Sequence, residues 1–276
     1  MTTVAAVPTG PATTRHTPDF RDLLRSERTK FTSLRSTWWC LGVLTVLGIG
    51  FNILVPALIT SSWNTMGPGT RQDFVRDTLG LVLQPGAQWA QIAACVLGVL
   101  FVASEFSTGM IRSTMLATPR RTPVLAAKAA VFAAVLFVLG VLIALPSLLI
   151  GSSITAAHAS LPLADPTTVR GVLGFGVYLA LTGVLALSIG ALIRHTAGAV
   201  TTVLALQFVL PAAFQAVPGN VGAHIAQALP AAANVMLGSG HNASDVYSPW
   251  QGALILLGWT AVLYAAAHLT LRRRNV

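Results

Sequence analysis

The chain has 276 residues, of which 54% are hydrophobic and only 9% are charged, with a formal net charge of +9. A soluble domain carries about 25% charged residues, so this composition excludes an ordinary water-facing surface and predicts contact with lipid. The positive charge does not indicate a nucleic-acid binder, because the Lys and Arg residues bracket hydrophobic runs instead of gathering along one face.

The N-terminal part divides into a tail and a helix. Residues 1–18 are rich in Thr, Ala and Pro without periodicity, which is typical of a disordered tail. Residues 19–37 predict an amphipathic helix, because apolar residues recur there at helical spacing beside a flank of arginines. We expect this basic helix to lie in the inner membrane interface, near anionic headgroups.

One carboxylate interrupts the apolar stripe of this helix. Glu27 falls in its middle, where an unpartnered charge would be costly. Two interpretations stay open. Glu27 either snorkels or pairs locally with Arg28 or Lys30, or this face of the helix docks on protein instead of lipid.

Six hydrophobic segments then follow, each long enough or nearly long enough to cross a bilayer as a helix. We place them at about 40–60, 86–103, 124–150, 171–193, 197–217 and 250–271. Residues 38–276 therefore predict a single six-helix, all-α transmembrane domain. The first segment lacks the short apolar core and the cleavage site of a signal peptide, so we expect it to remain as a span.

The basic residues predict the orientation. With the N-terminus inside, fourteen Lys and Arg residues fall on the inner side and three, Arg71, Arg76 and Arg170, on the outer side. The positive-inside rule therefore places both termini in the cytoplasm.

Three connecting segments are long enough to carry structure. Residues 104–122 form an inner loop with apolar residues at spacing suited to a short helix, which could dock a partner or remain a solvated re-entry helix. The outer loop at about 61–85 is expected to be irregular. The outer loop at 218–249 is weakly amphipathic and interrupted by Pro230, which predicts one or two short helices.

Little in the sequence indicates catalysis or a metal centre. We find no metalloprotease or serine-hydrolase motif and no carboxylate pair inside a span, and the histidines are scattered, so we predict neither an enzyme nor a metal site. Cys40 and Cys95 fall in apolar runs, as small core residues do. Polar residues inside spans mark transport paths, and Asn52 and Gln207 are the best placed, although amides more often bond a neighbouring helix.

The order of these pieces resembles the ABC-2 type permeases, the membrane subunits of a class of bacterial ATP-binding-cassette exporters. Residues 26–31, Ser-Glu-Arg-Thr-Lys-Phe, and residues 34–39, Leu-Arg-Ser-Thr-Trp-Trp, look like the amphipathic entry helix of the family's actinobacterial branch. Residues 104–109, Ser-Glu-Phe-Ser-Thr-Gly, with Arg112 and then Pro119-Arg120-Arg121, look like its cytoplasmic coupling segment. The chain departs from the family at Met110, where a hydroxyl is common.

The resemblance implies a permease subunit in the bacterial plasma membrane, working as a homo- or heterodimer with a separate cytoplasmic ATPase. It places Glu105, Thr108, Gly109 and Arg112 at the contact with that ATPase, and Glu27, Arg28 and Lys30 in the entry helix. The chain lacks a Gly-x-x-x-x-Gly-Lys-Ser/Thr phosphate loop, so ATP would be bound by the partner and no cofactor is expected on this chain.

The absence of an ionisable group at mid-span favours a hydrophobic or amphiphilic substrate. The alternative is a membrane protein of the same fold that does not transport, such as an immunity, sensing or assembly scaffold.

Overall fold

The computed structural model describes residues 20–33, 35–107, 121–217, 220–240 and 246–273. These residues are helical or in short connections, and no strand occurs among them. The elements, in chain order, are α1 (Phe20–Ser33), α2 (Arg35–Ser61), η1 (Trp63–Thr65), α3 (Pro68–Arg76), α4 (Thr78–Ser107), α6 (Arg121–Thr155), α7 (Pro166–Ile193), α8 (Thr196–Leu204), η2 (Ala205–Val209), α9 (Leu210–Gln215), α10 (Asn220–Gln227), η3 (Pro230–Leu237) and α11 (Pro249–Arg273).

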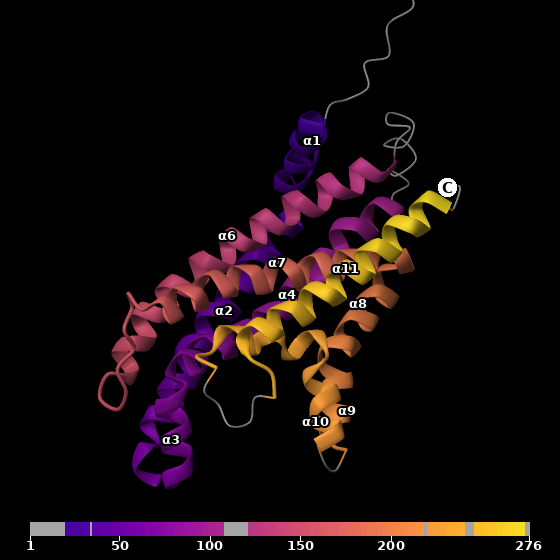
Figure 1. The fold of residues 1–276 in the computed structure, drawn as a ribbon. Coiled ribbons are helices and arrows are strands. Elements are labelled where there is room, and N and C mark those ends of the chain that lie inside the picture. Colours follow the sequence, from indigo (N-terminus) through magenta and orange to yellow (C-terminus); the bar gives the residue numbers. More distant parts are fainter. Residues whose placement is uncertain (1–19, 34, 108–120, 218–219, 241–245, 274–276) are drawn as a thin grey trace, which may run out of the picture.

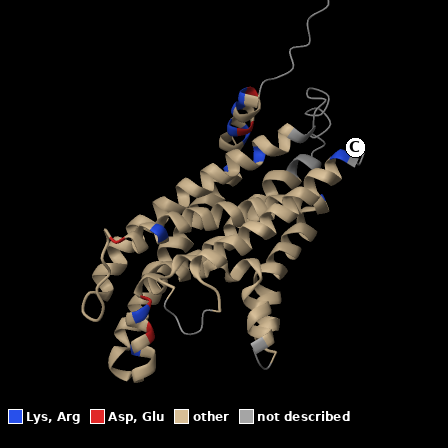
Figure 2. Cartoon of the chain, viewed as in Figure 1, with Lys and Arg blue, Asp and Glu red and all other residues tan. Residues whose placement is uncertain are grey.

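The predicted fold class is confirmed. Within the described residues, six helical stretches are long and apolar enough to cross a membrane: α2, α4, α6, α7, the continuous run α8–η2–α9, and α11. Helix α1 and the C-terminal end of α11 lie at one end of this bundle, the predicted inner end, while α3 and α10 lie at the other, outer end (Figure 1). Figure 2 shows charged residues gathered toward these two ends, with a long uncharged stretch between them.

The first outer loop was predicted wrongly. Residues 61–85 are not irregular, because they form η1, α3 and the first turns of α4. The second span accordingly begins at Thr78 and not near residue 86. Gln84 and Pro85 interrupt the apolar run in the sequence, but α4 continues through both residues, and Gln84 lines the wall of a polar cavity.

Helices α4 and α7 form the centre of the bundle. In the most apolar 18-residue stretch of each helix, 72% of the residues of α4 and 78% of those of α7 are buried. The corresponding share in the four other, peripheral spans is 22–33%. Glycines allow this close packing, as in many membrane helix pairs. A Cβ added at Gly98 of α4 would lie 2.7 Å from the Gly183 carbonyl of α7, and one added at Gly140 of α6 would lie 2.7 Å from the Cα of Gly176 of α7.

Two outer connections are fixed by carboxylates. Asp77, which follows α3, is buried and accepts backbone hydrogen bonds from Gly80 at 2.9 Å and from Ser239, just after η3, at 2.7 Å. Asp165 caps the N-terminus of α7 and accepts from the Thr167 N–H at 2.9 Å. Asp77 thereby ties the start of α4 to the segment after η3, while Asp165 fixes the first turn of α7.

The cap at Asp165 predicts a dependence of stability on pH. Its hydrogen bonds with Thr167 lower the pKa of Asp165 below the ordinary value of 3.8. Because the folded-state pKa is lowered, the contribution of the cap to stability is fully present above that ordinary value and is lost as the pH falls through the lower, folded-state pKa.

We expect Asp165→Ala to lower the thermal midpoint at pH 7 and to reduce the loss of stability on acidification. Asp165→Asn, which keeps a capping oxygen, should stay close to wild type at pH 7 and show the same reduced acid dependence, and an unchanged acid profile in both variants would contradict the assignment.

Candidate functional site

The entry helix α1 is fastened to the transmembrane bundle by a buried ion pair. Glu27 is 1% exposed. Its Oε2 lies 2.7 Å from Nζ of Lys128 in α6, and its Oε1 lies 2.9 Å from Nζ of Lys30 in α1. Both interpretations of Glu27 therefore apply in part: the carboxylate pairs locally, and its face of α1 docks on protein, namely α6 of the same chain.

Three phenylalanines surround this ion pair. Phe31 of α1 packs edge-on against Phe101 of α4 and Phe132 of α6, with ring centroids 5.2 and 6.0 Å apart. Phe101 and Phe132 stack at 5.5 Å. Lys128 lies over the ring of Phe101 at 4.1 Å, an attractive cation–π geometry. We call the set Glu27, Lys30, Phe31, Phe101, Lys128 and Phe132 the entry-helix anchor.

The anchor joins the three helices next to the predicted coupling segment. Helix α4 ends at Ser107, inside the predicted segment 104–122, and α6 begins at Arg121, near the end of that segment. The anchor lies about two turns from these ends, at Phe101 in α4 and Lys128 in α6. A push or pull on the segment would therefore act on α1, α4 and α6 together, because aromatic packing and a buried ion pair resist separation.

The structure places the other predicted coupling residues as follows. Glu105 lies in the last turn of α4, while Thr108, Gly109 and Arg112 lie outside the described residues. Arg28 is exposed on α1, away from the buried Glu27. The local contact of Glu27 is therefore with Lys30, one of the two residues proposed for it from the sequence.

Asn52 of α2 lies in a contact between three helices. It is fully buried, its Oδ1 accepts from the backbone N–H of Gly86 in α4 at 2.7 Å, and its Nδ2 donates to Oγ of Ser147 in α6 at 3.1 Å. The adjacent Pro85 interrupts the regular hydrogen bonding of α4. These contacts give Asn52 a structural role, the commoner one for an amide within a membrane helix.

Gln207 lies in an irregular part of the fifth span. Residues 205–209 form a π-helical turn in which the Leu210 N–H donates to the Ala205 carbonyl, just before Pro211. Such turns are frequent at functional sites. The side chain is 1% exposed, and neither amide atom has a hydrogen bond of standard geometry among the described residues, although the thiol of Cys95 lies beside it. An ordered water or a bound ligand would satisfy such an amide.

Gln207 lies in the wall of a polar cavity of about 340 Å³ between α4, the fifth span and η3. Its wall contains six residues that carry side-chain amides and, among the described residues, none that is charged; the six are Gln84, Gln88, Gln207, Gln215, Gln227 and Asn234. The amide atoms of Gln207 are themselves buried. Some of them bond within the protein: Asn234 donates to Gln88 at 3.4 Å, and Gln227 accepts from the Val246 N–H at 2.7 Å. We call this space the amide cavity.

The amide cavity was not expected from the sequence, although a signal for it was present. Gln84, Gln88 and Gln91 recur at helical spacing on one face of α4. Gln91 continues the polar face inward, where the Tyr178 hydroxyl donates to its Oε1 at 2.6 Å. A polar stripe on an otherwise apolar membrane helix indicates either a helix contact or a path for polar groups.

The amide cavity can hold groups that donate and accept hydrogen bonds without charge. Amides present both donors and acceptors, so they suit hydroxyl, amide or ester groups of a ligand. The described residues bring no three His, Cys, Asp or Glu side chains together that could hold a metal ion. No protein-family model matches this chain, and a search of curated proteins also gives no match.

Proposed function

We propose that the chain is the membrane-spanning subunit of an ATP-driven exporter of the ABC-2 type, in a bacterial plasma membrane. In this proposal two such chains form the pathway, and a separate cytoplasmic ATPase supplies the energy. The observation that carries the proposal is the entry-helix anchor. A permease driven from the cytoplasm needs its cytoplasmic helix and the ends of its spans to move together, and the anchor ties α1 to α4 and α6 beside the predicted docking segment.

The amide cavity supports a transport role. It lies toward the outer end of the bundle, between a central span and two interrupted segments, and its wall contains Gln207, which belongs to a π-helical turn of the kind that is frequent at functional sites. A substrate that carries uncharged polar groups on an apolar body would match both this lining and the apolar spans around it. The amphiphilic class expected from the sequence is therefore retained in the proposal.

Co-purification from the native membrane tests this function directly. The tagged chain would be extracted in mild detergent, and its partners identified by mass spectrometry. We expect a stoichiometric P-loop ATPase together with a second permease chain. Recovery of folded protein without an ATPase would favour the non-transporting scaffold.

The coupling segment gives a sharper prediction. We expect Glu105→Lys to reduce the coupling of ATP hydrolysis to the membrane subunit at least about tenfold, because reversing a charge at a docking surface costs more than about 1.4 kcal/mol of contact energy. A bulky residue at Gly109 should act in the same direction. Membrane insertion and thermal stability of the permease should stay at wild-type values, and the measurement is ATPase stimulation in proteoliposomes. Arg76→Glu, an exposed position at the outer end, is the control, and normal stimulation by the Glu105 variant would contradict the assignment of this segment.

A further inference from the structure

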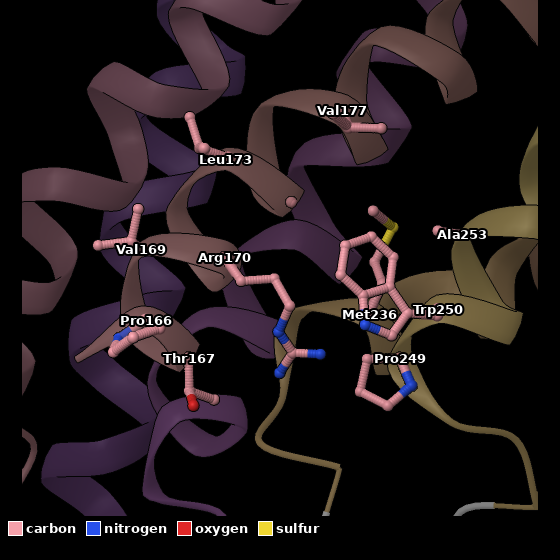
Figure 3. Close-up of a pocket in the computed structure, with 11 residues that line it drawn as sticks. Pro166, Thr167, Val169, Arg170, Leu173, Val177, Met236, Pro249, Trp250 and Ala253 are labelled. Carbon is pink, nitrogen blue, oxygen red and sulfur yellow. The ribbon is translucent and has the colours of Figure 1, made fainter.

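A second pocket, of about 570 Å³, opens between α7 and α11 near the outer end of the bundle (Figure 3). Its walls are apolar and come from α7, α11 and η3; they include Val169, Leu173, Val177, Met236, Trp250 and Ala253. The polar side chains in its lining are those of Arg170 and Thr167. This pocket is separate from the amide cavity and from the entry-helix anchor.

The pocket is polar at one end and apolar along its length. Helices α7 and α11 both begin at the outer end, at Pro166 and Pro249. Arg170 lies in the second turn of α7, and Leu173 and Val177 follow one and two turns deeper, so the apolar wall extends roughly 10 Å beyond the arginine. Figure 3 shows the guanidinium beside Pro249, toward the start of α11, and Val177 and Ala253 away from it. This gradient matches a molecule with a polar head and an apolar chain.

The guanidinium of Arg170 is held in place by the protein, and some of its N–H groups remain able to donate hydrogen bonds to a ligand. One Nη2–H of Arg170 donates to the Gly238 carbonyl at 2.6 Å. The carboxylate of Asp77 attracts it electrostatically, while Oδ1 of Asp77 accepts from two backbone N–H groups. The remaining N–H groups of an arginine fork can bind a phosphate in a bidentate manner. A fixed guanidinium above an apolar wall is therefore suited to an anionic headgroup.

We propose that this pocket binds one acyl chain of an anionic phospholipid of the outer leaflet, with the phosphate on Arg170. The rim side chains Val169, Leu173 and Trp250 are 48%, 48% and 69% exposed, and tryptophan favours the level of the headgroups in a bilayer. An apolar surface of a second protein chain would cover the remaining N–H groups of Arg170 without offering them acceptors, which is costly, whereas a lipid phosphate supplies those acceptors. This proposal does not depend on the exporter function.

Lipid titration followed by native mass spectrometry tests the proposal. The full chain in mild detergent would be titrated with phosphatidylglycerol or with phosphatidylcholine of identical acyl chains. We expect one retained phosphatidylglycerol with an apparent Kd about tenfold lower than that of phosphatidylcholine. Both lipids offer a phosphate, but phosphatidylcholine also brings a choline ammonium close to the guanidinium, which repels it. Arg170→Gln should bring the ratio close to one, and Arg170→Lys should keep part of it.

Two further variants locate the site. Ala253→Phe should fill the apolar wall and abolish retention of either lipid, whereas Val262→Phe, on an exposed position of α11 outside the pocket, should leave binding unchanged. If Arg170→Gln fails to fold, Arg170→Lys and Ala253→Phe still decide the question.

Four results would overturn the proposal. They are equal affinity of the wild-type chain for the two lipids, an unchanged preference in Arg170→Gln, equal retention in Ala253→Phe, and binding of inorganic phosphate as tightly as of phosphatidylglycerol. If Ala253→Phe dissociates a dimer while lipid retention persists, the occupant is a second copy of the chain, and the lipid proposal fails.

Discussion

Glu27→Leu is expected to destabilise the protein by about 3–5 kcal/mol, because it removes the carboxylate that faces a buried ammonium. The side chain of Lys128 is only 4% exposed, so water cannot readily hydrate the ammonium group once its carboxylate partner is gone. The cost should appear as a lower thermal midpoint in mild detergent and as faster proteolysis between α1 and α2. Lys128→Met should cost less, because the Glu27 carboxylate keeps its contact with Lys30, whose side chain is 29% exposed.

The double variant separates the ion pair from general packing. Replacing a buried ion pair by apolar residues of similar size is often neutral, so Glu27→Leu with Lys128→Met should recover most of the stability lost in Glu27→Leu. In the assembled complex the double variant also tests whether the charge, or only the contact between α1 and α6, is needed for coupling. A double variant as unstable as Glu27→Leu would show that the pair is not the cause, and wild-type stability of Glu27→Leu would exclude its role in the anchor.

Gly86→Ala is expected to have the largest effect of any single methyl group added to the bundle. A Cβ at Gly86 would overlap the carbonyl of Gly48 and the side chain of Asn52, both in α2. Backbone cannot rotate away as a side chain can, so α2 and α4 must separate. That separation also weakens the bond from the Gly86 N–H to Oδ1 of Asn52. We expect a loss of about 1–3 kcal/mol or more from overpacking, read as a lower thermal midpoint and a lower yield of monodisperse protein.

Gly50→Ala is the matched control. Gly50 lies in α2, as Gly48 does, but a Cβ there would meet nothing within 4 Å. Alanine stabilises a helix interior by about 0.5–1 kcal/mol relative to glycine, so this variant should be as stable as wild type or more so. Equal stability of the Gly86 and Gly50 variants would show that the close approach of α2 and α4 does not limit the fold.

Only part of the candidate site could be predicted from the sequence. Glu27 and Lys30 were singled out because a carboxylate in an apolar stripe needs a partner, but Lys128 was read only as one of the basic residues of the inner side. Gln207 was selected as a polar residue inside a span, whereas the five other amides of the amide cavity were not. Arg170 was used for orientation alone, and the pocket beside it depends on how α7, α11 and η3 pack.

The sequence alone determined the all-α membrane fold, the six spans and the amphipathic entry helix, because these depend on the length and hydropathy of each segment. A backbone in lipid must satisfy its own hydrogen bonds, so an apolar run of sufficient length can only be a helix. Only the tertiary structure decided that Glu27 meets Lys128, that Asn52 joins α2 to α4 and α6, and that Gln84 lies inside a helix facing a cavity. These pairings depend on the register between helices, which glycine contacts such as Gly86 on Gly48 set through packing, and no property of a single segment specifies that register.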